Sequence, residues 1–157
     1  MDDQLAETMT GFPLLQGFTP QGTHRLLERG EVRACSKGEI LFKEGDPPAF
    51  AVLVLVGKIQ AFVERESGDM ILADVGPGTI LGELSVLCGT SRAASVRASE
   101  AATVLQWNAS AFRNLLLRYP LLSERIFKES LRTLVEKERA LIDSVARLSY
   151  GNDNPSE

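Results

Sequence analysis

Histidine and cysteine are scarce in this chain of 157 residues, which has one histidine and two cysteines. A metal enzyme built on a β-barrel needs two or three histidines with a carboxylate, and an iron–sulfur centre needs about four cysteines, so neither centre is expected. Cys35 and Cys88 are too few for a disulfide scaffold, which favours a reduced, cytoplasmic protein. A cysteine–histidine nucleophile would have to pair Cys88 with His24, and nothing else in the sequence supports it. We expect no catalytic residue, no metal and no cofactor.

Long apolar runs and blocks of positive charge are also missing. No run approaches the roughly 20 apolar residues that span a bilayer, and the first four residues are acidic where a signal peptide would be basic. The formal net charge is −4, and no block of lysine or arginine exceeds two residues. The sequence therefore lacks the cluster of positive charge that binds a polyanion. We therefore expect neither membrane insertion nor direct binding of nucleic acid.

The remaining composition, 44% hydrophobic and 24% charged, suits one domain with a helical extension. Residues 1–30 form an N-terminal helical segment, in which Thr19 can cap a helix and Pro20 suits its first position. His24 lies on that helix with no partner evident in the sequence. Residues 31–107 hold short strands separated by glycine- and proline-containing turns, a spacing typical of an antiparallel sandwich or barrel. Within them, the apolar run 50–56 predicts a strand covered on both faces, and residues 58–64 and 70–75 predict a hairpin around 66–69.

Residues 108–149 are predicted to be helical, and residues 150–157 form a polar tail. A short helix should end at Tyr119, because a residue before proline is forced out of helical geometry. A long helix follows from Pro120. Its apolar residues alternate spacings of three and four, with Glu138 filling the missing step, which makes a heptad seam. The seam residues are Phe127, Leu131, Leu134, Leu141, Val145 and Leu148, and Val135 and Ile142 widen the apolar face.

This seam has two interpretations. An amphipathic helix most often packs its apolar stripe on its own domain, here the strand region. The alternative is a dimer through the long helix, and the widened face would let the helix cover its own domain with one edge and meet a second copy with the other.

Residues 82–96 combine a helix start with one carboxylate, Glu83, and one arginine, Arg92, among small residues. Separately, each has an ordinary explanation: an acidic residue suits a first helical turn, and an arginine suits a solvated strand. Together, nine residues apart and with Gly82, Ala93 and Ala94 leaving the backbone accessible, they favour a site for a small anion. Glu83 would repel that anion, so its natural partner is a neutral donor such as a sugar hydroxyl.

The segment resembles the phosphate-binding cassette of cyclic nucleotide-binding domains, in which Gly-Glu-Leu-Ser is followed by a turn and then by Arg-Ala-Ala. The resemblance implies a mainly β fold with flanking helices: an antiparallel β-roll, or jelly-roll barrel, with a short cassette helix and a long C-terminal helix. It also implies that Glu83 accepts a hydrogen bond from the ribose 2′-hydroxyl and that Arg92 pairs with the cyclic phosphate. Backbone N–H groups would line the rest of the pocket, at Gly82, Glu83, Leu84, Ser85, Ala93 and Ala94.

The resemblance gives two indications of the base. Ala93 occupies the position where many cGMP-selective members have a threonine, which favours cAMP. Lys137 and Glu138 lie where bacterial members carry the residues that cap adenine, and they depart from that pattern. Glu138 could accept from the adenine amino group, pair with two donors on the guanine edge, or fix dimer register as a polar seam residue.

The expected function is therefore that of a non-catalytic regulatory domain that binds cAMP, with cGMP as the alternative ligand, and couples binding to movement of the C-terminal helix. The expected partners are the cyclic nucleotide, a second copy of the chain and an unidentified effector acting in trans. Two other functions stay open: a ligand-independent scaffold or dimerisation module that uses the long helix, and a sensor of another small anion.

Overall fold

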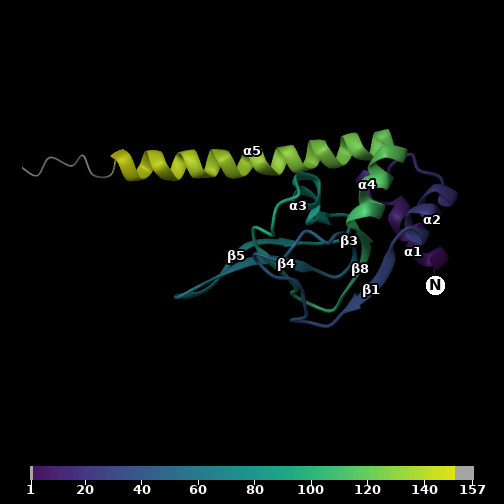
Figure 1. Ribbon diagram of the computed structural model, residues 1–157, viewed down its shortest axis with the longest axis horizontal. Helices are drawn as coiled ribbons and strands as arrows, with labels where there is room; N and C mark the ends of the chain where they lie inside the picture. Colours follow the sequence, from purple (N-terminus) through teal and green to yellow (C-terminus); the bar gives the residue numbers. More distant parts are fainter. Residues whose placement is uncertain (1, 151–157) are drawn as a thin grey trace, which may run out of the picture.

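The computed structural model describes residues 2–150, which fold around two antiparallel four-stranded sheets (Figure 1). One sheet has the order β1 (Glu31–Cys35), β8 (Ala102–Asn108), β3 (Phe50–Val56) and β6 (Ile80–Leu81). The other has the order β2 (Ile40–Phe42), β7 (Ser95–Ala98), β4 (Ile59–Arg65) and β5 (Gly68–Val75). This architecture, with helices beside the sheets, confirms the predicted mainly β roll.

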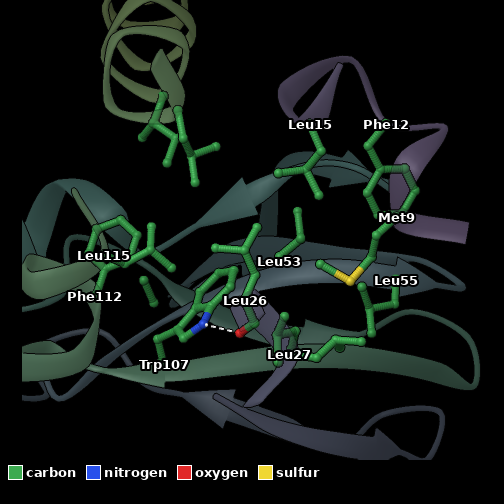
Figure 2. Packing of buried hydrophobic residues seen from close by; sticks show 14 of the residues in the cluster. Met9, Phe12, Leu15, Leu26, Leu27, Leu53, Leu55, Trp107, Phe112 and Leu115 are labelled. Carbon is green, nitrogen blue, oxygen red and sulfur yellow. Dashed lines mark hydrogen bonds between the residues drawn. The ribbon is translucent and has the colours of Figure 1, made fainter. Parts of the chain in front are cut away.

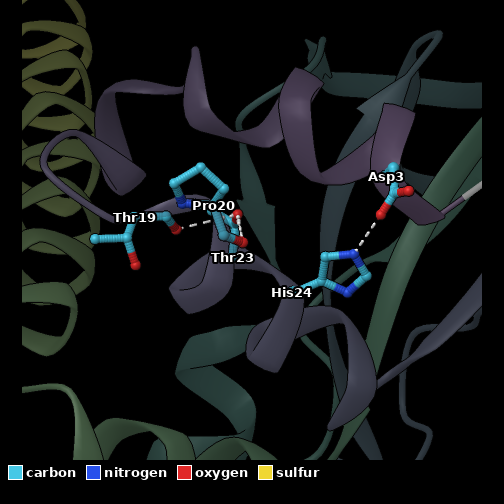
Figure 3. Close-up of polar contacts among 5 residues, drawn as sticks. All are labelled: Asp3, Thr19, Pro20, Thr23 and His24. Atoms are coloured by element: carbon cyan, nitrogen blue, oxygen red, sulfur yellow. Dashed lines mark hydrogen bonds and ion pairs between the residues drawn. The ribbon is translucent and has the colours of Figure 1, made fainter.

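The N-terminal segment packs as helices α1 (Asp2–Thr10) and α2 (Pro20–Glu28), with a 3₁₀ turn η1 (Pro13–Leu15) between them. Thr19 caps α2 as predicted, because its Oγ1 accepts a hydrogen bond from the Gly22 N–H at 3.0 Å. His24, for which the sequence shows no partner, finds one on α1 in the folded chain. Its Nε2 lies 2.7 Å from Oδ1 of Asp3 on α1 (Figure 3), and this hydrogen bond and charge lower the pKa of Asp3.

Strand β3 lies between two hydrophobic clusters, which confirms that both of its faces are covered. Leu53 and Leu55 point toward the helices and pack in the cluster that contains Trp107 (Figure 2). Val52 and Val54 point the other way, into the interior of the roll. Each fully buried side chain of this size stabilises the fold by about 1.5–3 kcal/mol. Trp107 also satisfies its indole N–H, which donates to the Leu26 carbonyl at 3.1 Å and ties α2 to the roll.

The hairpin of β4 and β5 is tighter than predicted. The strands extend to Arg65 and Gly68, which pair with each other, so that two residues connect them in place of the five between the predicted strands. Gly68 has a φ of 114°, a conformation that residues with a side chain rarely adopt, and β5 therefore begins at this glycine.

Three helices complete the fold: α3 (Glu83–Cys88), α4 (Ala109–Arg118) and α5 (Pro120–Tyr150). Asn108 caps α4 by accepting the Ala111 N–H at 2.8 Å, and α4 ends before Tyr119 as predicted. Helix α5 then runs along the molecule over α3 (Figure 1). Residues 151–157, most of the predicted polar tail, lie outside the described residues. None of the helices within residues 2–150 is both long and apolar enough to cross a membrane.

The heptad seam of α5 is largely exposed, and of its members only Leu134 lines the cleft beside the roll, so the interpretation in which the whole stripe packs on its own domain is wrong. Between residues 120 and 149, the buried side chains of α5 are Leu122, Ser123, Ile126 and Ser130. The seam and its widening residues are 42–73% exposed: Phe127, Leu131, Leu134, Val135, Leu141, Ile142, Val145 and Leu148. Ile126 and Ser130, which face the protein, each come one residue before a seam position. The seam therefore lies on the neighbouring side of the helix, turned away from the roll.

Candidate functional site

A cleft of about 780 Å³ lies between the roll and α5. Its volume is within the range of about 300–1,000 Å³ that is usual for small-molecule sites. The cleft is lined by the cassette (residues 82–94), by the inner side of α5, and by apolar residues of η1 and β5. All seven residues predicted to bind the ligand line it: Gly82, Glu83, Leu84, Ser85, Arg92, Ala93 and Ala94.

The backbone of the cassette depends on two glycines that bound α3. Gly82 precedes the helix with a φ of 76°, and a Cβ there would lie 2.6 Å from Nη1 of Arg92. Gly89 follows the helix with a φ of 66° and donates its N–H to the Ser85 carbonyl. These two left-handed residues limit α3 to six residues and bring Glu83 to its first turn.

Arg92 is buried, with 2% of its surface exposed. Its Nη1 donates to the Gly82 carbonyl at 2.8 Å and its Nη2 to the Phe50 carbonyl at 2.5 Å. The guanidinium carbon lies 3.9 Å from the centre of the Phe42 ring, a cation–π contact. Its backbone is fixed as well, because its N–H donates to the Asp46 carbonyl at 2.9 Å. Arg92 is therefore held rigidly beside the cleft, and not extended into it.

The guanidinium of Arg92 keeps unused donors. A guanidinium has five N–H groups, and the two bonds to carbonyls use two of them. Its Nε is the buried polar side-chain atom within residues 2–150 that has no hydrogen-bond partner. Burial lowers the pKa of Arg92, and the charges of Asp46 and Glu83 oppose that shift. An anion beside these donors would remove an unsatisfied buried group that costs about 1–3 kcal/mol.

Glu83 accepts a hydrogen bond at Oε1 from Ser130 Oγ of α5, over 2.8 Å. Burial raises the pKa of Glu83. Hydrogen bonds from its own backbone N–H and from Ser130 oppose this, as do the positive charges of Lys137 and Arg92. Glu83 and Arg92 therefore lie on the same cleft with complementary charges, but each is bonded to other groups and not to the other.

Nine residues of α5 line the cleft. Four of these follow one another at spacings of four, three and four, and we call them the inner stripe: Ile126, Ser130, Thr133 and Lys137. Each comes one residue before a position of the heptad seam. The sequence interpretation missed Ser130 and Thr133, because it followed apolar periodicity and these two are polar. Of the two residues expected to cap the base, Lys137 lines the cleft and Glu138 does not.

Arg125 fixes the start of α5 beside the cleft. Its Nη1 donates to the Leu14 carbonyl at 3.0 Å and to the Gln16 carbonyl at 2.6 Å, which joins α5 to the N-terminal segment. Within the described range, no group of three or more histidine, cysteine, aspartate or glutamate residues is placed to hold a metal ion. The cleft thus combines the buried cation of Arg92, the half-buried carboxylate of Glu83, apolar walls, and the charged and hydroxyl side chains of α5.

Comparison with known proteins gives consistent matches. Residues 32–119 match the family model described as "Cyclic nucleotide-binding domain". The cyclic AMP receptor protein of Thermus thermophilus is 31% identical over 134 residues, which are 85% of this chain and 62% of that protein. The crystal structure of the Thermus thermophilus catabolite activator protein has a TM-score of 0.75 at 30% identity, covering 85% of this chain and 63% of that one.

Lysophospholipase NTE1 of Chaetomium globosum is 31% identical over 107 residues, which are 68% of this chain but 7% of that protein. The chain therefore spans less than two thirds of the bacterial relative and a small part of the fungal one. The similarity concerns one domain of each.

Proposed function

Because this chain belongs to the family of cyclic nucleotide-binding domains, we propose that it is a non-catalytic regulatory domain that binds a cyclic purine nucleotide, cAMP in preference to cGMP. The observation that carries this proposal is the cleft itself, where a buried arginine with unused donors and a half-buried carboxylate line one cavity of nucleotide-binding size. In this proposal residues 31–107 are the binding unit, and residues 1–30 and 108–149 support it.

The cyclic phosphate would bind at Arg92. Hydrogen bonds between a cation and an anionic oxygen are roughly twice as strong as those between neutral groups, so a phosphate is a better partner for the guanidinium than a backbone carbonyl. The stacking on Phe42 holds the guanidinium plane in place before the ligand arrives. Little side-chain entropy is then lost when the phosphate binds.

The ribose would bind at Glu83. An ionised carboxylate offers about four lone-pair positions and no donor, so it can accept the 2′-hydroxyl in addition to the hydroxyl of Ser130. This contact distinguishes ribose from deoxyribose. A carboxylate here also disfavours a second phosphate at the sugar, because two negative charges would be close together in a poorly solvated cleft.

The preference for cAMP rests on Ala93, which lines the cleft without a hydroxyl that could bond to guanine. Lys137 does not decide between the bases, because an ammonium only donates and both purines carry ring nitrogens that accept. Titration calorimetry with cAMP and cGMP tests the preference, and tighter binding of cGMP would overturn it. Ala93→Thr should move the preference toward cGMP, while Ala94→Thr, one residue along, controls for the addition of any hydroxyl.

Thermal unfolding with cyclic mononucleotides and cyclic dinucleotides tests the function as a whole. A ligand that binds only the folded chain stabilises it by about 2.7 kcal/mol at 100 times its Kd, which raises the melting temperature by several degrees. Linear 5′-AMP is the control, since it keeps the base and sugar but not the cyclic phosphate. No shift with any cyclic mononucleotide would refute the proposal, and a shift with a different anion would favour the anion sensor.

A second part of the proposal concerns the exposed seam of α5. Its apolar side chains continue over several turns and are 42–73% exposed in the single chain, and a second copy would cover them as a coiled coil. Glu138 would then fix the register as a polar seam residue. Ligand-driven movement of α5 would be the output, to be detected by an effector in trans. A dimer that forms equally with and without nucleotide, together with no thermal shift, would favour the scaffold function.

A further inference from the structure

Ser130 makes the hydrogen bond that joins α5 to the cassette. It is 6% exposed, although it lies in the middle of a largely exposed helix, and the described side chains beyond it on α5 are all exposed. The other bonds from α5 side chains to the rest of the described chain lie nearer its start, where Arg125 reaches η1 and Ser123 reaches the Leu116 carbonyl of α4. Among the polar α5 side chains that line the cleft, Ser130 is therefore the one in the described range that has a hydrogen bond to the cassette.

The direction of this bond is fixed by chemistry. An ionised carboxylate can only accept, so the Ser130 hydroxyl donates to Glu83 over 2.8 Å. Such a bond favours the ionised form and restricts the carboxylate to one orientation. Without it, Glu83 would keep its own backbone N–H as a donor but would lose the hydroxyl that holds Oε1 from the α5 side.

The remaining charges around Glu83 come from two elements. Lys137 of α5 and Arg92 of the cassette act on its carboxylate, and both are positive. The cleft-lining residues of η1 and of the strands are uncharged. The other charged residues of α5 that line the cleft are Arg125, Lys128, Glu129 and Arg132. Ser130 is thus the neutral hydroxyl group in a set of partners that otherwise act by charge or through the backbone.

We propose that Ser130 is a positioning residue for the nucleotide: its hydroxyl keeps the Glu83 carboxylate ionised and aimed so that it accepts the ribose 2′-hydroxyl. This inference rests on the proposed function, since it assigns the support of one contact within that site. The proposal treats the contacts to the sugar and to the phosphate of the nucleotide as independent. The sugar contact depends on Ser130, whereas the phosphate contact at Arg92 does not.

The test compares cAMP with 2′-deoxy-cAMP by titration calorimetry. The wild-type chain should bind cAMP about 10- to 100-fold more tightly, as expected for a hydrogen bond to a charged group. Ser130→Ala should bring this preference to within about threefold, through weaker binding of cAMP alone. Ser130→Thr keeps a hydroxyl and should restore the preference. Ser123→Ala removes another buried serine of α5, away from the cleft, and should leave the preference unchanged.

The pH profile gives a second readout. Loss of a donor to the ionised form raises the pKa of Glu83 further. In Ser130→Ala, the affinity for cAMP should therefore begin to fall at a higher pH than in the wild type as the solution is acidified. Binding of 2′-deoxy-cAMP should show no such difference. Ser130→Cys, whose thiol is a weak donor of similar size, provides the same comparison if the alanine variant unfolds.

Two results would overturn the inference: an unchanged preference in Ser130→Ala, or an equal loss of affinity for both nucleotides, which would indicate a purely structural role. In either case wild-type binding of cAMP stays intact. A wild-type chain that binds neither nucleotide would instead refute the proposed function, and the inference with it, so the two failures are distinguishable.

Discussion

Replacement of Arg92 by methionine tests the assignment of the phosphate contact most directly. Methionine has a similar length and an apolar side chain, so it can keep contact with the Phe42 ring while it removes the charge and all five donors. In the ligand-free chain, the carbonyls of Gly82 and Phe50 lose their guanidinium partner. Methionine carries no charge that must be buried, and this offsets part of that loss. We therefore expect the free energy of unfolding to fall by about 1–3 kcal/mol.

The effect on binding should be separate and larger. A hydrogen bond to a charged group contributes about 1.5–3 kcal/mol. Loss of the guanidinium should therefore weaken cyclic nucleotide binding by about 10- to 100-fold if one such bond is lost, and by more if both the Nε and an Nη donate to the phosphate. Titration calorimetry at a temperature where all variants are folded measures this difference, and circular dichroism checks that they are.

Two controls separate the phosphate contact from general damage. Arg113→Met removes another bond from an arginine to a backbone carbonyl, that of Val86 in α3, but Arg113 does not line the cleft. Arg65→Met removes an exposed arginine whose Nη1 lies 3.4 Å from a carboxylate of Glu44. Both should keep nucleotide affinity within about threefold. An Arg92→Met variant that binds as tightly as the folded Arg113→Met control would refute the phosphate assignment.

Three further predictions concern the glycine, the carboxylate and the seam. Gly82→Ala should lower the free energy of unfolding by about 1–2 kcal/mol because of the positive φ, and by a further amount because its Cβ would lie 2.6 Å from the Arg92 guanidinium. Gly38→Ala also has a positive φ, of 87°, but open space around its Cβ, so it should show only the first loss when both variants are unfolded with denaturant. Burial raises the pKa of Glu83 in the folded chain above its usual value of 4.5. The protonated carboxyl group therefore favours the folded state at pH values below 4.5, and this stabilisation is lost as the pH rises through the folded-state pKa. Glu83→Gln should therefore be increasingly more stable than the wild type toward neutral pH, and a constant difference would contradict the burial. Leu141→Glu with Val145→Glu should convert a dimer to a monomer in sedimentation experiments with no loss of monomer stability, because both side chains are exposed in the single chain.

The features that the sequence predicted correctly are those set by neighbouring residues. Thr19 caps α2 because its hydroxyl meets an N–H three residues later, and α4 ends before Tyr119 because Pro120 follows it. The same holds for the course of β3, since a continuous apolar run can be buried on both sides only between two layers. The cassette residues meet in one cleft because they are close along the chain, on one turn and one helix.

The features that the sequence did not predict are contacts between distant residues. The carbonyl partner of Arg92 at Phe50 is 42 residues away, the serine partner of Glu83 is 47 residues away, and Asp3 is 21 residues from His24. Such pairs depend on the docking of a helix or the register of a sheet, which local patterns do not encode. A backbone carbonyl is present in every residue, so the amino-acid type at a position does not indicate that its carbonyl will bond to Arg92.

What the sequence reasoning missed on α5, its polar inner stripe, has a different cause, which bears on its function. Consecutive residues of a helix differ by about 100° around its axis, so the inner stripe and the seam are adjacent faces of one rigid element. Apolar periodicity identified the seam, because the inner stripe carries Ser130, Thr133 and Lys137 where a helix buried on its own domain would carry leucine or valine. Polar residues are suited to a face that meets a ligand and not a core. Any rotation of α5 must move both faces together, so a ligand that pulls the inner stripe toward the cassette would also reorient the seam. If the seam binds a second copy, ligand affinity and dimer affinity are then thermodynamically linked, each changing the other by the same factor.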